Sequence, residues 1–139
     1  MAKDDKLSKL RILVIDDNLD SRVLAKTMLH DAGYTKVTTI EDPLVALARV
    51  QRGLADFVFL DWRMPKLPGI ELLRIIRSND RELPMVMLTN VTDREAVVQA
   101  LHAGANDYIV KPFTTETLVA KIDEVINKKH EQEIEEEVA

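Results

Sequence analysis

The sequence predicts an α/β fold in which a parallel sheet of five strands is covered by helices on both faces. The first observation is a set of short apolar runs, each ending at a polar residue, at 12–15, 57–60, 85–88 and 108–110. Continuous apolar runs of this length are typical of strands buried on both faces of a parallel sheet. The second observation is that helical patterns separate the runs with short connections, which favours parallel strands joined by right-handed crossovers.

The first half of the chain contains three of these strands and two helices. After the strand at 12–15, residues 20–32 predict a helix that Gly33 ends, with one apolar face made of Val23, Leu24, Met28 and Leu29. Residues 37–40 are rich in β-branched side chains and predict a strand near an edge of the sheet. Asp42 and Pro43 mark the start of the next helix, which ends at Gly53 before the strand at 57–60.

The second half continues the same alternation. Residues 69–78 carry a broad apolar face and precede the strand at 85–88. The four residues from Thr92 to Glu95 have the spacing of a capping box and open a helix that ends at Gly104. After the strand at 108–110, a last helix starts near Thr114 with apolar residues at three- and four-residue steps, namely Leu118, Ile122, Val125 and Ile126.

Length and composition describe one domain with its own core, since the chain has 139 residues and 46% hydrophobic residues. Its net charge of −5 disfavours nucleic acid and anionic membranes as partners, and no apolar run is long enough to span a bilayer. The absence of cysteine excludes disulfides and thiolate zinc sites. Because the amino terminus lacks a signal-peptide pattern, we expect a cytoplasmic location.

The two ends differ in composition from the middle of the chain. We expect a flexible amino terminus over 1–8, one folded domain over 9–130 and an acidic tail over 131–139. Glutamates near the carboxyl end of a helix oppose its dipole, so the tail is expected to fray. It either solubilises the protein or binds a partner.

Polar residues of different chemical types follow the predicted strands. Asp16 and Asp17 follow the first, Asp61 the third, Thr89 the fourth and Lys111 the fifth. The carboxyl ends of parallel strands share one edge, where three carboxylates would repel one another unless a hard cation such as Mg²⁺ joined them. The ammonium and the hydroxyl can contact phosphoryl oxygens, and Asp61 can act as the nucleophile.

Each residue also has a simpler interpretation. Asp16, Asp17 and Asn18 are common helix caps, and Asp61 can simply terminate a strand. Thr89 can reflect strand propensity, and Lys111 can belong to a solvated loop. It is the combination of all of them that favours phosphoryl chemistry.

The same residues carry a resemblance to a known family. Asp16-Asp17, the segment from Asp61 to Pro65 with Gly69, then Thr89, and the segment from Gly104 to Phe113 resemble the receiver domain of two-component response regulators. The resemblance covers roughly residues 9–128. It implies a flavodoxin-like strand order 2-1-3-4-5 and Mg²⁺-dependent phosphorylation of Asp61 by a histidine kinase or a histidine phosphotransfer protein.

The resemblance also implies the Mg²⁺ ligands. Asp17, Asp61 and the main-chain carbonyl of Arg63 would bind the ion directly, and Asp16 would hold a metal-bound water.

Further roles concern the phosphoryl group and the response to it. Lys111, Thr89 and Asn90 would contact the phosphoryl group, and the peptide bond between Lys111 and Pro112 would be cis. Thr89 would move toward the phosphoryl group while Tyr108 turns inward. This switch would change a protein-binding surface over residues 93–130.

Some positions depart from the common pattern of the family. Asn90 is larger than the residue usual there, which predicts slower reaction with bulky phosphodonors and slower hydrolysis. Arg63 and Val91 occupy positions that tune phosphoryl lifetime, and the apolar Val91 cannot orient an attacking water. Arg63 can either shield the phosphoryl group or face solvent. We expect a long-lived phosphoryl state.

Several functions compete at this stage. A stand-alone switch that binds a protein target is favoured, since about ten residues after the last helix leave no room for a DNA-binding output domain; a relay intermediate passing the phosphoryl group to a histidine phosphotransfer protein is the alternative. Mg²⁺-dependent phosphohydrolases that form an aspartyl phosphate carry an Asp-x-Asp pattern with the nucleophile after the first strand. Here Asp16 and Asp17 are adjacent and the best nucleophile, Asp61, follows the third strand, so we do not expect an enzyme. A flavodoxin-like cofactor binder needs a loop rich in glycines and hydroxyls in place of Asp16-Asp17. A phosphorylation-independent scaffold is the last possibility.

Overall fold

The computed structural model describes residues 7–90 and 94–138. Within these residues a helical turn at 7–9 precedes strands and helices that alternate in the order β1 (Arg11–Ile15), α2 (Leu19–Asp31), β2 (Lys36–Ile40), α3 (Pro43–Gln51), β3 (Phe57–Asp61), α4 (Gly69–Asn79), β4 (Met85–Thr89), α5 (Arg94–His102), β5 (Asp107–Val110) and α6 (Thr115–Val138). The predicted alternation is confirmed. Of the predicted capping box, Thr92 and Asp93 lie outside the described residues.

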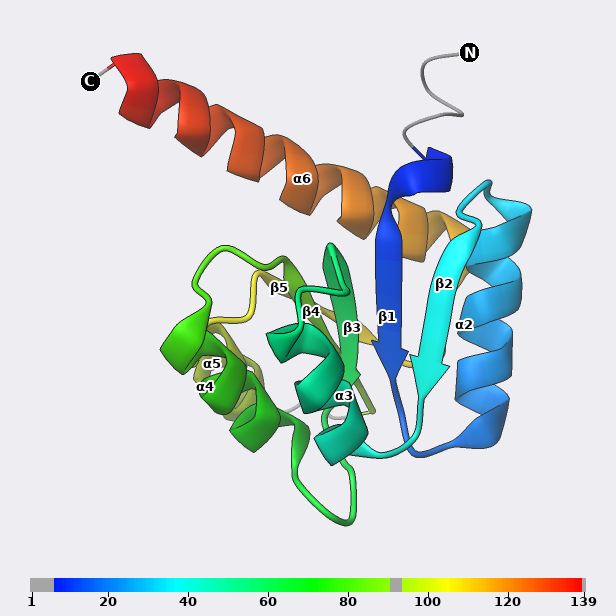
Figure 1. The fold of residues 1–139 in the computed structure, drawn as a ribbon. Helices are drawn as coiled ribbons and strands as arrows, with labels where there is room; N and C mark the ends of the chain where they lie inside the picture. Colours follow the sequence, from blue (N-terminus) through cyan, green and yellow to red (C-terminus); the bar gives the residue numbers. More distant parts are fainter. Residues whose placement is uncertain (1–6, 91–93, 139) are drawn as a thin grey trace.

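The strands form one parallel sheet in the order β2-β1-β3-β4-β5, which is the order that the resemblance implied. β2 lies at an edge, as its β-branched sequence predicted. The chain moves outward from β1 in one direction to β2 and in the other to β3, so a crevice is expected at the carboxyl ends of β1 and β3. In Figure 1 the strands run downward, and this edge is the lower one.

Helices cover both faces of the sheet, and each face has its own core. On one face, α2 and α6 pack on alternate strand residues such as Val14, Phe59 and Leu88. On the other face, α3, α4 and α5 pack on Leu13, Leu60 and their neighbours. Side chains alternate between faces along a strand, so the continuous apolar runs are explained by burial on both sides.

The predicted apolar face of α2 is confirmed for Leu29, which is buried, and for Met28, which packs against the core. It is wrong for Val23 and Leu24, which are exposed, while Ala25 is buried instead. A face at three- and four-residue spacing that includes Leu29 runs through Ala25 and Arg22, so the two larger apolar residues at 23 and 24 point away from the sheet.

The described parts of the two ends are more ordered than their composition predicts. Leu7, assigned to the flexible terminus, packs against the core beside α2 and α6, and the Thr35 hydroxyl donates a hydrogen bond to the Ser8 carbonyl oxygen at 3.3 Å. Residues 1–6 lie outside the described residues. The acidic tail was expected to fray, but α6 continues to Val138 and extends past the sheet (Figure 1). Glu, Gln and Lys are strong helix formers, and that propensity outweighs the unfavourable dipole interaction.

No helix in the described part of the chain is long and apolar enough to cross a membrane.

Candidate functional site

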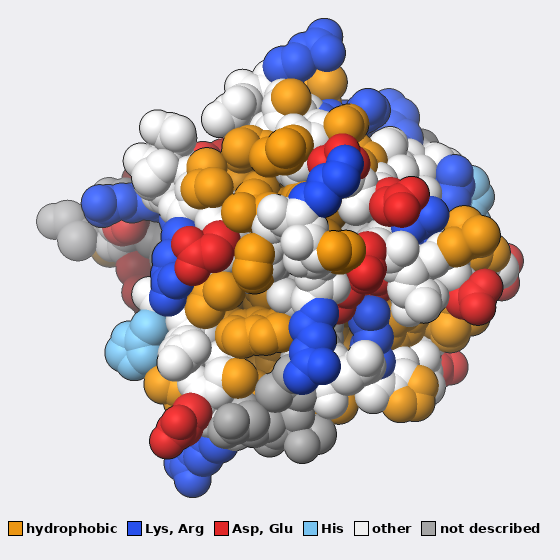
Figure 2. Space-filling view, turned by 90° about the horizontal axis from the view of Figure 1, so that it is seen from below, with side chains coloured by type: hydrophobic (Ala, Val, Ile, Leu, Met, Phe, Trp, Pro, Cys, Tyr) orange, Lys and Arg blue, Asp and Glu red, His pale blue; other side chains and the backbone are white. Residues whose placement is uncertain are grey.

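The polar residues that follow the strands meet at the lower edge of the sheet. Asp17, Asp61 and Lys111 line a cavity of about 520 Å³ there. Its other walls are Asn18, Ser21, Leu24, Asn90, Pro112 and Phe113. Figure 2 looks onto this side of the molecule, where hydrophobic side chains are interspersed with charged ones of both signs. The cavity is lined both by charged side chains and by the apolar Leu24, Pro112 and Phe113.

Three carboxylates lie close together at this edge, and two of them, those of Asp17 and Asp61, line the cavity. One oxygen of each of Asp16, Asp17 and Asp61 lies within 4.8 Å of the other two. Asp16 is fully buried, Asp61 is 6% exposed, and Asp17 is exposed to solvent. This donor set fits a small hard cation such as Mg²⁺, which binds proteins through carboxylate oxygens and keeps several waters.

The electrostatics of Asp61 reflect this crowding. Burial, and then the negative charge of Asp16, raise the pKa of Asp61 to about 7, although the nearby Lys111 ammonium acts in the opposite direction. A protonated Asp61 can also hydrogen-bond to Asp17, which favours the neutral form. A cation among the carboxylates would favour the ionised form.

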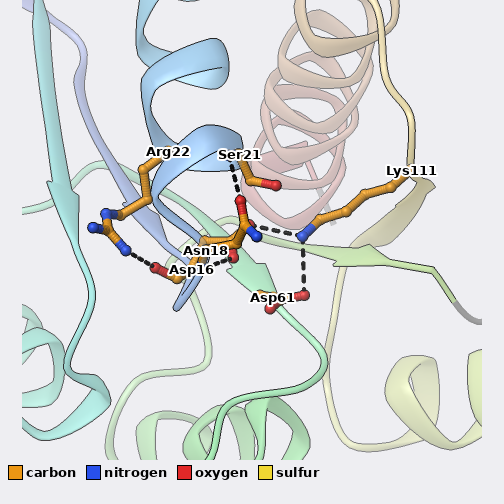
Figure 3. A network of polar contacts seen from close by, with 6 residues as sticks. All are labelled: Asp16, Asn18, Ser21, Arg22, Asp61 and Lys111. Atoms are coloured by element: carbon orange, nitrogen blue, oxygen red, sulfur yellow. Dashed lines mark hydrogen bonds and ion pairs between the residues drawn. The ribbon is translucent and has the colours of Figure 1, made fainter.

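Lys111 supplies the positive charge of the site. Its Nζ donates to Asp16 Oδ2 at 2.8 Å and to Asp61 Oδ1 at 3.3 Å, and Figure 3 shows the ammonium reaching in between the two aspartates. The peptide bond between Lys111 and Pro112 is cis, as the resemblance implied. The Lys111 main-chain N–H donates to the Thr89 carbonyl oxygen at 2.8 Å, so the ends of β4 and β5 are joined at the site.

The β1–α2 turn shows that capping and the carboxylate cluster are compatible. Asn18 caps α2, because its Oδ1 accepts from the Ser21 main-chain N–H at 2.9 Å. The Asn18 N–H in turn donates to Asp16 Oδ1 at 2.9 Å. The cap therefore needs only Asn18, and Asp17 remains available for a cation.

Arg22 is a site residue that the sequence analysis missed. It lies in the first turn of α2, and its Nη1 donates to the main-chain carbonyl oxygen of Asp16 at 2.8 Å (Figure 3). The available signal was a long basic side chain on the face of α2 that also carries Ala25.

Thr89 and Tyr108, the predicted switch pair, line the same small cavity beneath α5, together with Trp62. Thr89 is buried at the end of β4, and Tyr108 is half-buried. The cavity volume is about 10 Å³, which is no larger than one water needs. A phenol ring can therefore enter only if a wall moves.

The remaining predicted residues are more peripheral. Asn90 is exposed and lines the mouth of the larger cavity. The Arg63 side chain is exposed in the β3–α4 loop, and Val91 lies outside the described residues.

Gly69 approaches the end of β3 closely, which residue type alone did not reveal. Its N–H donates to the Trp62 carbonyl oxygen at 2.9 Å. A Cβ atom at position 69 would lie 3.0 Å from the Asp61 carbonyl carbon and closer still to the carbonyl oxygen. Only glycine fits against the residue that ends β3.

Comparisons with known proteins agree with this geometry. Residues 12–123 match the family described as the response regulator receiver domain. The chain is 40% identical over 121 residues to chemotaxis protein CheY-3 of Vibrio cholerae, covering 86% of this chain and 93% of that protein. It is 37% identical to chemotaxis protein CheY of Pseudomonas aeruginosa, with 86% and 98% covered. The solved structure of Vibrio cholerae chemotaxis protein CheY4 superposes with a TM-score of 0.77 at 34% identity, over 84% of this chain and 98% of that one.

Proposed function

Because the chain belongs to the response regulator receiver family, we propose that Asp61 accepts the phosphoryl group and that the surface around β5 passes the signal to a protein target. Members of this family are phosphoacceptor switches, and the chain acts in this way rather than as a turnover enzyme. The observation that carries the assignment of Asp61 is its buried carboxylate, 3.3 Å from Lys111 Nζ and within a cluster of three acids.

The carboxylate cluster is suited to Mg²⁺. Asp16, Asp17, Asp61 and the main-chain carbonyl of Arg63 are the proposed holders of the ion, directly or through water. Bound there, Mg²⁺ would neutralise the carboxylates and the oxygens of an incoming phosphoryl group. Asp16 and Asp61 already share a cation in the form of the Lys111 ammonium, which supports the need for positive charge at this place.

The residues then divide the transfer between them. An oxygen of the ionised Asp61 attacks phosphorus, the bond from phosphorus to the donor's histidine nitrogen breaks, and the electron pair leaves with the imidazole. The Lys111 ammonium then donates a hydrogen bond to one negatively charged phosphoryl oxygen, and the Thr89 hydroxyl donates to another. Asn90, at the cavity mouth, restricts the approach of donor and water.

The response follows from the small cavity beneath α5. As Thr89 moves toward the phosphoryl group, Tyr108 turns inward, and α5 has to yield because the cavity is too small for the ring. The outer surface of this region exposes Val98, Leu101 and Val110, a suitable patch for a protein target on the 93–130 face. Phosphorylation would shift the population toward the form that this target binds.

The phosphodonor is proposed to be a histidine kinase or a histidine phosphotransfer protein. α2 carries exposed apolar residues that a donor protein could contact: Leu24 lines the cavity, and Leu19 and Val23 are more than half exposed. A donor protein that covers them would bring its phosphohistidine to Asp61 and exclude water. A cytoplasmic location remains a prediction.

Phosphoryl incorporation tests the proposal. The full chain is incubated with a small acyl phosphate, with and without Mg²⁺, and its intact mass is measured. We expect wild type to gain one phosphoryl group only with Mg²⁺, and Asp61→Asn to gain none. The matched control is Asp56→Asn, which changes a half-buried aspartate paired with Arg11 at the opposite edge of the sheet and should behave as wild type. Equal incorporation by Asp61→Asn would refute the assignment.

A further inference from the structure

We propose that Arg22 is a positioning residue for the cation site: its guanidinium donates to the Asp16 carbonyl oxygen and holds the Asp16–Asp17 turn in the orientation that binds a divalent cation. The inference rests on the proposed function, since it concerns the cation affinity of the same site. Arg22 itself does not contact the cation.

The contact is short and sheltered. Arg22 Nη1 donates to the Asp16 carbonyl oxygen at 2.8 Å, and the Arg22 side chain is only 13% exposed. Its other nitrogen, Nη2, lies 3.9 Å from Glu41 Oε2, which provides a counter-charge at the end of β2. Figure 3 shows Arg22 reaching Asp16 from the side opposite Lys111.

All four polar atoms of Asp16 form hydrogen bonds, and the carbonyl oxygen forms its bond with Arg22. Its N–H donates to the Ile40 carbonyl oxygen at 3.1 Å, Oδ1 accepts from the Asn18 N–H, and Oδ2 accepts from Lys111. A cation that enters the site competes with Lys111 for the carboxylate. The contact with Arg22 lies on the far side and is left in place.

The geometry of the peptide bond carries this hold to Asp17. The carbonyl oxygen of Asp16 and the nitrogen of Asp17 belong to one rigid plane. A guanidinium that fixes the oxygen therefore fixes the direction in which the chain continues into Asp17. Without it, the exposed Asp17 would have more freedom, and its carboxylate would have to be ordered when the cation binds.

Electrostatics alone predict the opposite effect. A positive charge near the carboxylates weakens the binding of another cation, so removing Arg22 would strengthen it if charge dominated. The guanidinium points at a neutral carbonyl and faces Glu41, which reduces this repulsion. Positioning and charge thus change the affinity in opposite directions, and a measurement can separate them.

A second, more exposed contact involves the β3–α4 loop, which carries the proposed Mg²⁺ ligand at Arg63. Next to Glu41, Asp42 accepts a hydrogen bond at 2.9 Å from Nζ of Lys66, in the loop that contains Arg63. The Lys66 side chain is 65% exposed, and exposed ion pairs contribute little. We expect a smaller effect from this pair than from Arg22.

The test is a Mg²⁺ titration of the full chain, followed through the fluorescence of Trp62, which is the single tryptophan and directly follows Asp61. Arg22→Met keeps the length of the side chain but removes charge and donors, and Arg22→Lys keeps the charge without the planar fork. The matched control is Arg11→Met, which removes an arginine paired with Asp56 at the opposite edge. Thermal unfolding without Mg²⁺ is recorded for each variant.

We expect Arg22→Met to raise the Kd for Mg²⁺ about tenfold, as losing a group that orients a metal ligand does. Arg22→Lys should lie between this variant and wild type, and Arg11→Met should leave the Kd unchanged. If Arg22→Met does not fold, a severalfold increase in Kd for Arg22→Lys supports the same conclusion.

Two results would overturn the inference. A Kd that stays at the wild-type value while the Tm falls would mean that Arg22 only stabilises the fold. A Kd that falls would mean that its charge dominates. If wild type itself did not bind Mg²⁺, the proposed function would fail first, so the two failures are distinguishable.

Discussion

Replacing Gly69 by alanine is expected to damage the site through the backbone of the phosphoacceptor strand. The added Cβ would lie 3.0 Å from the Asp61 carbonyl carbon, 3.1 Å from the Trp62 Cα and closer still to the Asp61 carbonyl oxygen. Non-bonded heavy atoms pack at about 3.5 Å or more, and the contact with the carbonyl oxygen is the shortest of the three, so relief of this contact requires a backbone shift of roughly 1 Å. This shift falls directly on the residue proposed to accept the phosphoryl group and on the loop that leads to Arg63.

The expected magnitude follows from this geometry. Overpacking of a rigid core typically costs about 1–3 kcal/mol of unfolding free energy. A displacement of about 1 Å at a reacting group can reduce a rate about a hundredfold. Local propensity predicts the reverse for stability, because Gly69 is the first residue of α4 and alanine favours helices by up to about 1 kcal/mol. The sign of the change in stability therefore already distinguishes the two arguments.

The assay combines chemical denaturation with Mg²⁺ titration and phosphorylation by an acyl phosphate. Gly53→Ala is the control, because Gly53 has a positive φ of 70° but a Cβ there would meet nothing within 4 Å. That variant should lose about 1–2 kcal/mol from backbone strain and keep wild-type Mg²⁺ affinity. A Gly69→Ala protein with unchanged stability and an unchanged phosphorylation rate would refute the reasoning.

Three further predictions concern titration, access and stability. The pKa of Asp61 is raised to about 7 in the folded protein. Between about pH 4 and pH 7 the Asp61 carboxyl therefore stays protonated in the folded protein but ionises in the unfolded chain. The free energy of unfolding consequently falls as the pH rises through this range. Asp61→Asn should therefore stabilise the Mg²⁺-free protein, by an amount that grows toward at most about 4 kcal/mol at pH 7; an advantage that does not change with pH would contradict this. Asn90→Ala should speed both phosphorylation by small donors and loss of the phosphoryl group severalfold, as followed by intact mass, and unchanged rates would rule out a gating role. Arg77→Met should lower the free energy of unfolding by about 2–3 kcal/mol and leave the Mg²⁺ affinity unchanged. The reason is that Arg77 donates to the Gly104 and Asp80 carbonyl oxygens and to Asn106, away from the site. A loss below about 0.5 kcal/mol would contradict this structural role.

The sheet and the centre of the site were predictable because both depend on local patterns. An apolar run that ends in a polar residue identifies a buried strand and also the residue at its carboxyl end. Asp16, Asp61, Thr89 and Lys111 were found in this way, and the parallel arrangement brings them to one edge.

Other features depend on three-dimensional packing and could not be read from the sequence. The contact of Arg22 with a main-chain carbonyl depends on how α2 is oriented on the sheet, and the clash at Gly69 depends on how the β3–α4 loop folds back. The orientation of α2 also explains the wrong assignment of Val23 and Leu24. More than one face of α2 carries apolar residues, and only the packing of the helix on the sheet decides which face is buried. Whether the acidic tail is helical depends on the balance between the helix propensity of its residues and the unfavourable interaction of its glutamates with the helix dipole. A sequence pattern does not give the size of either contribution.

The most direct test of the account locates the phosphoryl group itself. The chain is phosphorylated in the presence of Mg²⁺, reduced with borohydride, which converts an aspartyl phosphate to homoserine, and digested for peptide mass spectrometry. We predict homoserine at position 61 and unchanged aspartate at positions 16 and 17. Homoserine at either of those positions, or at none of the three in a chain that had gained a phosphoryl group, would contradict the account.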